Sequence, residues 1–250
     1  MTVWTLDPQY ASGVTGTAFA DLDAVFALQG KQITRDSLSE VLYVRMDGRG
    51  YYVKRYWAAG SYLRRLVGRP RIKGEWRNLL FFRAWGIPVA TVVGYGLERR
   101  AGAFYRGAMI TEELYETQDL ARLAANQDAR LRDRSWVLHV MRQIADATRI
   151  MHQRRFAHND LKWRNILVDN PPRSGVYMID CPTGTFWWGP LLEHRKNKDL
   201  ACLDKLGRVQ LSRTQRLRFY LMYVDRARLE PADKKRIRLV LGHMARRPHR

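Results

Sequence analysis

The chain has 250 residues, of which 46% are hydrophobic and 27% charged, enough for one two-lobed domain or two small domains with a sizeable core. Its two cysteines exclude a disulfide framework, and the lack of Cys/His clusters argues against a structural zinc, so a reducing cytoplasmic setting is expected. No apolar run approaches the roughly 20 residues needed to cross a bilayer, and the first residues lack a signal-peptide pattern, so we expect neither export nor integral insertion.

The strongest compositional bias is the formal net charge of +20, with a pI near 10.5. Such a charge favours a polyanionic partner, which is nucleic acid, anionic lipid or a phosphorylated glycolipid. Basic residues are spread along the whole chain. The sequence therefore predicts the kind of partner but assigns no single binding stripe.

Residues 1–38 are weakly patterned, and the first clear elements are two alternating runs, 40–46 and 51–56, separated by Asp47-Gly48-Arg49-Gly50. Alternation on both sides of a glycine-rich turn predicts a β-hairpin. Lys54 lies on the second strand. Taken alone, it is either a solvent-facing strand lysine or a lysine that binds phosphate.

A helix is predicted after Pro70, because apolar residues recur at helical spacing until Gly86 and Pro88 end the pattern. Glu75 lies in its first half, where it is either an ordinary exposed residue or an ion-pair partner that reaches back to Lys54. The preceding segment, Trp57 to Gly68, mixes aromatic and apolar side chains with two arginines. This mixture suits a membrane-surface contact and a packed connection equally well.

Three short strand-like runs follow at 89–93, 97–99 and 107–111, with turns expected at Gly94, Gly96 and Gly102. The last run leads into Thr111-Glu112-Glu113-Leu114. This polar segment suits a crossing from a small lobe to a large one.

The most informative stretch, MHQRRFAHNDLKWRN, follows a predicted helix over 135–153. It places His158, Asp160 and Asn165 in the spacing H-x-D-x-x-x-x-N, with Lys162 two residues after the aspartate. This spacing matches the catalytic loop of protein-kinase-like phosphotransferases, in which the carboxylate meets the attacking hydroxyl and the amide oxygen holds Mg²⁺. The alternative is a polar turn between a helix and a strand.

Two short strands, 166–168 and 176–179, are predicted next, and the second ends at Asp180. An aspartate at this place is either a metal-binding carboxylate or a strand-end residue that caps the next turn. The segment after Asp180 is aromatic and glycine-rich. Three alternative roles stay open for its Trp187 and Trp188: stacking on a sugar, entering a lipid interface, or packing on the large lobe. Helices are expected over 199–207, 213–224 and 234–244.

Lys54, Glu75, the catalytic-loop residues and Asp180 occur in the order found in the protein-kinase-like superfamily, which the chain resembles from about residue 40 to 240. More narrowly, it resembles the lipopolysaccharide core kinases, the bacterial Kdo and heptose kinase family, through the strings HNDLKWRNILV, KGEWRNLLFFRAWGIPVATVVGYG and MITEEL. The resemblance implies an α+β, protein-kinase-like two-lobed fold. A single domain would span 1–250, with a small β-rich N-lobe with one helix over about 1–112 and a mainly helical C-lobe over about 113–250.

The resemblance also assigns roles to individual residues. The nucleotide-binding residues would be Lys54 on the phosphates, Glu75 holding that lysine, and the backbone at Glu112 and Glu113 on the adenine edge. The catalytic residues would be Asp160 and Lys162, and the metal ligands Asn165 and Asp180. Asp199 would support the catalytic loop from beneath.

Two departures from the kinase pattern affect the expected site. No G-x-G-x-x-G precedes the hairpin, so a loop covering the phosphates must come from Gly30 to Ser39. There is no A-P-E element, and the D-F-G element is replaced by Asp180-Cys181-Pro182. The missing A-P-E element and the replaced D-F-G element argue against a phosphorylation-regulated protein kinase and favour a small-molecule or glycolipid kinase.

The resemblance therefore implies an ATP- and Mg²⁺-dependent kinase that phosphorylates a heptose or Kdo sugar of the lipopolysaccharide inner core. We expect a cytoplasmic protein, peripheral on the inner face of the inner membrane, with core glycolipid and anionic membrane as partners and no role for nucleic acid. One alternative is a protein Ser/Thr/Tyr kinase. Another is a catalytically silent basic module that binds anionic membrane or RNA, which has no need for the complete Lys, Glu, Asp, Asn, Asp set.

Overall fold

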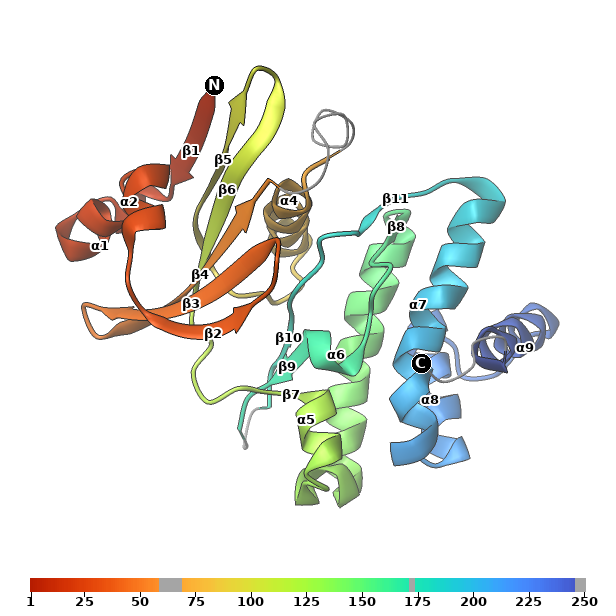
Figure 1. Cartoon of the computed structure of the whole chain (residues 1–250). Helices are drawn as coiled ribbons and strands as arrows, with labels where there is room; N and C mark the ends of the chain where they lie inside the picture. Colours follow the sequence, from red (N-terminus) through yellow and green to blue (C-terminus); the bar gives the residue numbers. More distant parts are fainter. Residues whose placement is uncertain (59–68, 171–173, 246–250) are drawn as a thin grey trace. The chain divides into compact units, whose positions relative to one another are not determined.

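The computed structural model describes residues 1–58, 69–170 and 174–245 (Figure 1). The chain forms two compact units, one of Met1–Phe81 with Ala90–Leu114 and one of Phe82–Val89 with Tyr115–Arg250. We call them the first and the second unit. Most of the Trp57 to Gly68 segment, for which the sequence left a membrane contact or a packed connection open, lies outside the described residues.

The first unit is built on a six-stranded antiparallel sheet with the strand order β1-β5-β6-β4-β3-β2. Its strands are β1 (Thr2–Leu6), β2 (Lys31–Arg35), β3 (Ser39–Met46), β4 (Arg49–Trp57), β5 (Val92–Arg100) and β6 (Ala103–Glu112). Its helices are the 3₁₀ turn η1 (Pro8–Tyr10), α1 (Gly13–Ala18), α2 (Leu22–Ala27) and α4 (Arg71–Ala84), whose last residues from Phe82 onward belong to the second unit.

The predicted hairpin is confirmed as β3 and β4, which are joined at Asp47 and Gly48. Both residues have positive φ, 49° and 76°, as the two-residue turn that matches the twist of a hairpin requires. The register places Lys54 in the middle of β4, opposite Val41 on β3 and Met109 on β6. Lys54 is therefore held by a strand on each side.

The turns predicted at Gly94 and Gly96 are wrong, because β5 runs through both residues. At Gly96 the sheet needs a glycine for close approach, since a Cβ there would lie 2.2 Å from the carbonyl oxygen of Val3 on β1. The weak pattern of residues 1–38 did not predict β1. The third expected turn is present at Ala101 and Gly102, which have φ of 47° and 80°.

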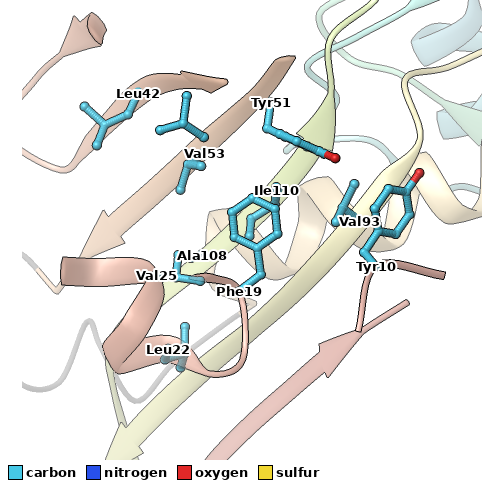
Figure 2. Packing of buried hydrophobic residues seen from close by; sticks show 11 residues of the cluster. Tyr10, Phe19, Leu22, Val25, Leu42, Tyr51, Val53, Val93, Ala108 and Ile110 are labelled. Carbon is cyan, nitrogen blue, oxygen red and sulfur yellow. The ribbon is translucent and has the colours of Figure 1, made fainter. Parts of the chain in front are cut away.

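Alternation along the strands gives the sheet two faces. One face is covered by the N-terminal helices and forms the core of the unit (Figure 2), with Tyr10, Phe19, Leu22 and Val25 packed on Leu42, Val44, Tyr51, Val53, Val93, Ala108 and Ile110. Because Val53 points into this core, its neighbour Lys54 points to the other face. There it meets α4, the confirmed helix, which carries Glu75.

The second unit is mainly helical. Its helices are α5 (Leu120–Ala125), the 3₁₀ turn η2 (Ala129–Arg132), α6 (Arg134–Gln153), the 3₁₀ turn η3 (Trp163–Asn165), α7 (Gly189–Gln210), α8 (Arg213–Val224) and α9 (Pro231–Ala245). Helix α7 begins at Gly189, well before the predicted start at Asp199. Its first turns are rich in charged residues, and this polar stretch hides the helical period in the sequence.

Short strands complete the second unit. β7 (Gln118–Asp119), β9 (Ile166–Val168) and β10 (Val176–Met178) form a three-stranded sheet in the order β10-β9-β7, and β8 (Phe156–Ala157) pairs with β11 (Thr185–Phe186). Within the described ranges, none of the helices is long and apolar enough to cross a membrane. A sheet-based unit and a helical unit agree with the predicted α+β class.

Candidate active site

Lys54 and Glu75 form an ion pair inside the first unit. The Nζ of Lys54 lies 2.7 Å from Oε1 of Glu75, whose side chain is only 3% exposed. The hydroxyl of Tyr56 donates to the other oxygen, Oε2, over 3.3 Å. The structure thus brings the two predicted residues together and adds Tyr56, which lies on the same face of β4 as Lys54 and was not predicted.

Glu112 and Glu113 lie at the end of β6, where their backbone already serves the sheet. The amide N–H of Glu112 donates to the carbonyl of Thr91 over 2.9 Å, and that of Glu113 to the carbonyl of Gly50 over 2.8 Å. The carboxylate of Glu113 accepts a hydrogen bond from Tyr43. Both amide N–H groups are therefore engaged within the protein.

The segment from Gly30 to Ser39, expected as a phosphate-covering loop, is strand β2 followed by a tight turn. The carboxylate of Asp36 accepts hydrogen bonds from the amides of Leu38, over 2.7 Å, and Ser39, over 2.8 Å. These bonds lower the pKa of Asp36. A glycine-rich turn would offer such amides to a phosphate, whereas here the protein's own carboxylate occupies them.

Asp160 lies in the second unit, in the loop between β8 and η3. Its Oδ1 is 2.5 Å from the Nζ of Lys162, and its Oδ2 is 3.3 Å from Nη2 of Arg164. Burial acts to raise the pKa of Asp160, but the hydrogen bond and charge of Lys162, together with Arg164, outweigh it and hold the pKa below its usual value. The carboxylate is therefore ionised at neutral pH.

His158 lies beneath this loop, fully buried and stacked on the ring of Phe82 with centroids 6.1 Å apart. Burial lowers the pKa of His158 and outweighs the charges of Asp199, Asp160 and Asp180, which act in the opposite direction. The imidazole is therefore neutral near pH 7.

Asn165 and Asp180 are brought together by the β9–β10 hairpin. The pairing continues past the last strand residues, because the amide of Ile179 donates to the carbonyl of Asn165 over 3.0 Å. Asp180 therefore lies one residue beyond the position opposite Asn165. The Nδ2 of Asn165 donates to the backbone carbonyl of Asp160 over 2.8 Å. The side-chain oxygen of Asn165 therefore points away from the Asp160 carbonyl. Asp180 has a φ of 57°, a left-handed conformation that aspartate adopts more readily than most residues.

These two side chains supply the kind of ligand that Mg²⁺ prefers. Among the residues that the structure describes, no group of three or more His, Cys, Asp or Glu could hold a metal ion by itself. Mg²⁺ commonly binds through one or two carboxylates and completes its shell with substrate phosphates and water. The carboxylate of Asp180 and the amide oxygen of Asn165 are ligands of the kind that this mode uses.

Asp199 is the centre of a buried network under the catalytic loop. Its Oδ2 accepts the amide of His158 over 2.7 Å and its Oδ1 that of Asn159 over 2.9 Å. The ring of His152 lies between this carboxylate, at 3.4 Å, and the hydroxyl of Tyr223, at 2.8 Å. In the sequence, His152 was visible only as a second histidine six residues before His158. Nothing in the sequence indicated Tyr223.

Comparison with known proteins shows the family to which the sequence of this chain is similar. The lipopolysaccharide kinase (Kdo/WaaP) family matches residues 20–223. The lipopolysaccharide core heptose(I) kinase WaaP of Pseudomonas aeruginosa is 28% identical over 230 residues, which cover 82% of this chain and 80% of the relative. The 3-deoxy-D-manno-octulosonic acid kinase of Mannheimia succiniciproducens is 28% identical over 160 residues, which cover 63% of this chain and 57% of the relative.

A solved structure shows the same fold over almost the whole length. The structure of WaaP in complex with acyl carrier protein superposes with a TM-score of 0.73 at 24% identity, covering 98% of this chain and 97% of that one. The predicted kinase-like α+β fold is thereby confirmed. Kinases of this kind are phosphotransferases that use ATP and a hydroxyl acceptor. Because the family match spans most of the sequence, the chain belongs to the lipopolysaccharide kinase (Kdo/WaaP) family.

Proposed function

We propose that this kinase transfers the γ-phosphate of ATP to a heptose or Kdo hydroxyl of the lipopolysaccharide inner core, at the cytoplasmic face of the inner membrane. The observation that carries the proposal is the geometry of Asp160. Its carboxylate contacts Lys162 over 2.5 Å and Arg164 over 3.3 Å, which hold its pKa below the usual value, and it remains 30% exposed, within reach of a ligand.

Asp160 is the residue we assign to the acceptor. An ionised carboxylate accepts a hydrogen bond from the sugar hydroxyl, orients its oxygen toward the phosphorus and receives the proton as transfer proceeds. Lys162 lies against the same carboxylate. We assign it to the transferred phosphoryl group, where its charge would stabilise the oxygens that carry the negative charge in the transition state.

The phosphates and the metal are assigned to the remaining residues. Lys54, kept in place by Glu75 and Tyr56, would bind the α- and β-phosphates. Asn165 and Asp180 would hold Mg²⁺ through an amide oxygen and a carboxylate, and the ion would supply charge neutralisation on the β- and γ-phosphates when bound.

Only part of the backbone at Glu112 and Glu113 can bind the adenine ring. Because the amide N–H of Glu112 donates to Thr91 and that of Glu113 to Gly50, we assign only backbone carbonyl oxygens of these two residues to the nucleotide. A carbonyl accepts from the exocyclic amine of adenine. The hydrogen bond to a ring nitrogen would have to come from a residue further along the chain.

The choice of a lipopolysaccharide acceptor is supported by charge and by the relatives. The net charge of +20 suits an anionic glycolipid on an anionic membrane, because both raise the local concentration of a basic protein. The two curated relatives are named as kinases of a core heptose and of 3-deoxy-D-manno-octulosonic acid. We propose the same class of acceptor for this chain.

The test is a phosphorylation assay with purified protein, ATP, Mg²⁺ and deacylated core oligosaccharide, read by mass spectrometry of the sugar product. We expect the parent to add one phosphate and Asp160→Asn to lose on the order of 10³-fold in rate. The matched control is Asp146→Asn, an aspartate that pairs with Arg149 on the surface of α6 and should leave the rate unchanged. Transfer to peptides but never to the oligosaccharide would identify a protein kinase instead.

A further inference from the structure

Strand β8 pairs with β11 at one end of the second unit, just before α7 begins (Figure 1). An aromatic cluster lies at this strand pair. Phe156 contacts Trp85 and Phe186 edge to face, with centroids 5.5 and 5.4 Å apart. The amide of Trp187 donates to the carbonyl of Arg155 over 2.9 Å. The chain therefore leaves this cluster at a fixed position as it enters α7.

The residues that follow are exposed although two of them are large and apolar. Trp188 is 63% exposed and Leu191, three residues further along the chain, is 60% exposed. Gly189 and Pro190 between them are exposed as well. Trp188 is the extended N-cap residue of α7 and Leu191 lies in the first turn of that helix, so the two exposed apolar side chains lie within four residues of each other at the start of α7. We call Trp188–Leu191 the tryptophan tip.

Trp187 behaves differently from its neighbour. The guanidinium of Arg195 lies over its ring at 4.5 Å from the centroid, and the ring is half-buried. Of the three roles that the sequence left open for the two tryptophans, Trp187 therefore has the packing role. Trp188 does not, since most of its ring faces solvent.

The surface next to the tryptophan tip is positively charged. Arg154 and Arg155 are both exposed at the end of α6, and Arg154 lies over the ring of Trp85 at 5.4 Å. Neither has an acidic partner among the ion pairs of the described residues. The acidic residue in the first turns of α7, Glu193, is neutralised by Lys196 at 2.9 Å and by Arg236.

We infer that the tryptophan tip, together with the exposed Arg154 and Arg155, forms the surface by which the protein binds an anionic bilayer. The indole and the leucine enter the interface between headgroups and acyl chains, a position that tryptophan favours. The arginines contact lipid phosphates. This surface deepens the proposed function, because a glycolipid acceptor is presented at a bilayer, but vesicle binding tests it without acceptor or ATP.

The experiment is co-sedimentation of the purified chain with vesicles of phosphatidylethanolamine containing about a third phosphatidylglycerol. We expect binding that weakens as salt rises, and little binding to phosphatidylcholine alone. Trp188→Ala combined with Leu191→Ala should weaken binding about tenfold. Arg154→Gln combined with Arg155→Gln should weaken it about 25-fold, or roughly fivefold per arginine.

Matched controls lie at the far end of the same helix and beyond it. Val209→Ala removes an apolar side chain that is 70% exposed but about 30 Å along α7 from the tip. Arg208→Gln combined with Arg218→Gln removes the same charge from two exposed positions. Both controls should bind vesicles like the parent.

Three outcomes would overturn the inference. The first is equal binding of the parent to neutral and anionic vesicles. The second is a loss in the controls as large as in the tip and arginine variants. The third is unchanged vesicle binding by those variants with a lower rate on deacylated oligosaccharide, which would mean that this surface contacts the sugar. A chain that binds vesicles as expected but phosphorylates no core sugar would leave this surface in place and remove only the proposed function.

Discussion

Substitution of Asp199 should show how much the support of the loop that carries Asp160 contributes to the rate, because Asp199 holds this loop without contacting the substrate. Its fully buried carboxylate accepts the amides of His158 and Asn159 over 2.7 and 2.9 Å, immediately before Asp160. In Asp199→Ala both amides lose their acceptor. A buried donor left without a partner costs about 1–3 kcal/mol, so the two together cost about 2–6 kcal/mol. This is a large part of the roughly 5–15 kcal/mol that stabilises an ordinary domain.

Asp199→Asn is the more informative variant, because its side chain keeps one acceptor oxygen and the volume of the parent. We expect it to lose about 1–3 kcal/mol of unfolding free energy, measured by urea denaturation. We also expect kcat to fall at least tenfold with a smaller change in the KM for ATP, because the affected amides position Asp160.

The matched control for Asp199 is Asp204→Asn on the same helix. Asp204 forms two hydrogen bonds of 2.6 Å with Arg216, so the variant loses a good ion pair but no contact with the catalytic loop. It should lower stability and leave kcat unchanged. The reasoning is refuted if Asp199→Asn loses stability with an unchanged kcat, or if both variants lose kcat equally.

Three further predictions concern other parts of the molecule. Lys54→Met should reduce kcat/KM about 10²-fold or more in the phosphorylation assay, and Glu75→Gln should reduce it less, since its amide oxygen still accepts a hydrogen bond. Arg164→Gln should move the acid limb of the pH–rate profile upward, because the arginine helps to lower the pKa of the catalytic-loop aspartate. Asp160 acts in its ionised form, so activity is lost as the pH falls through its pKa. An acid limb at the same pH in the parent and in Arg164→Gln would contradict this prediction. Gly96→Ala should lower the free energy of unfolding by about 1–3 kcal/mol through overpacking, measured by thermal denaturation. The control Gly242→Ala, at a position with open space around it, should leave the stability unchanged.

The sequence by itself determined the elements whose signal is local. The hairpin of β3 and β4, the helix α4 and the β9–β10 pair were predicted because alternation, helical spacing and turn residues act over a few positions. The spacing of Asp160 and Asn165 within one short segment is a local signal of the same kind, and the catalytic and metal-binding roles that it predicts for them stay predictions.

Only the tertiary structure decided the contacts between segments distant in the chain. Gly96 indicated a turn until β1 was seen to approach it, and Lys54 had two possible environments until its face of the sheet was known. The family resemblance implied that Asp199 supports the loop of Asp160, but only the structure showed its link through His152 to Tyr223, which joins three helices. Such contacts arise from packing between elements, and no local pattern of residue types records which buried polar groups will meet.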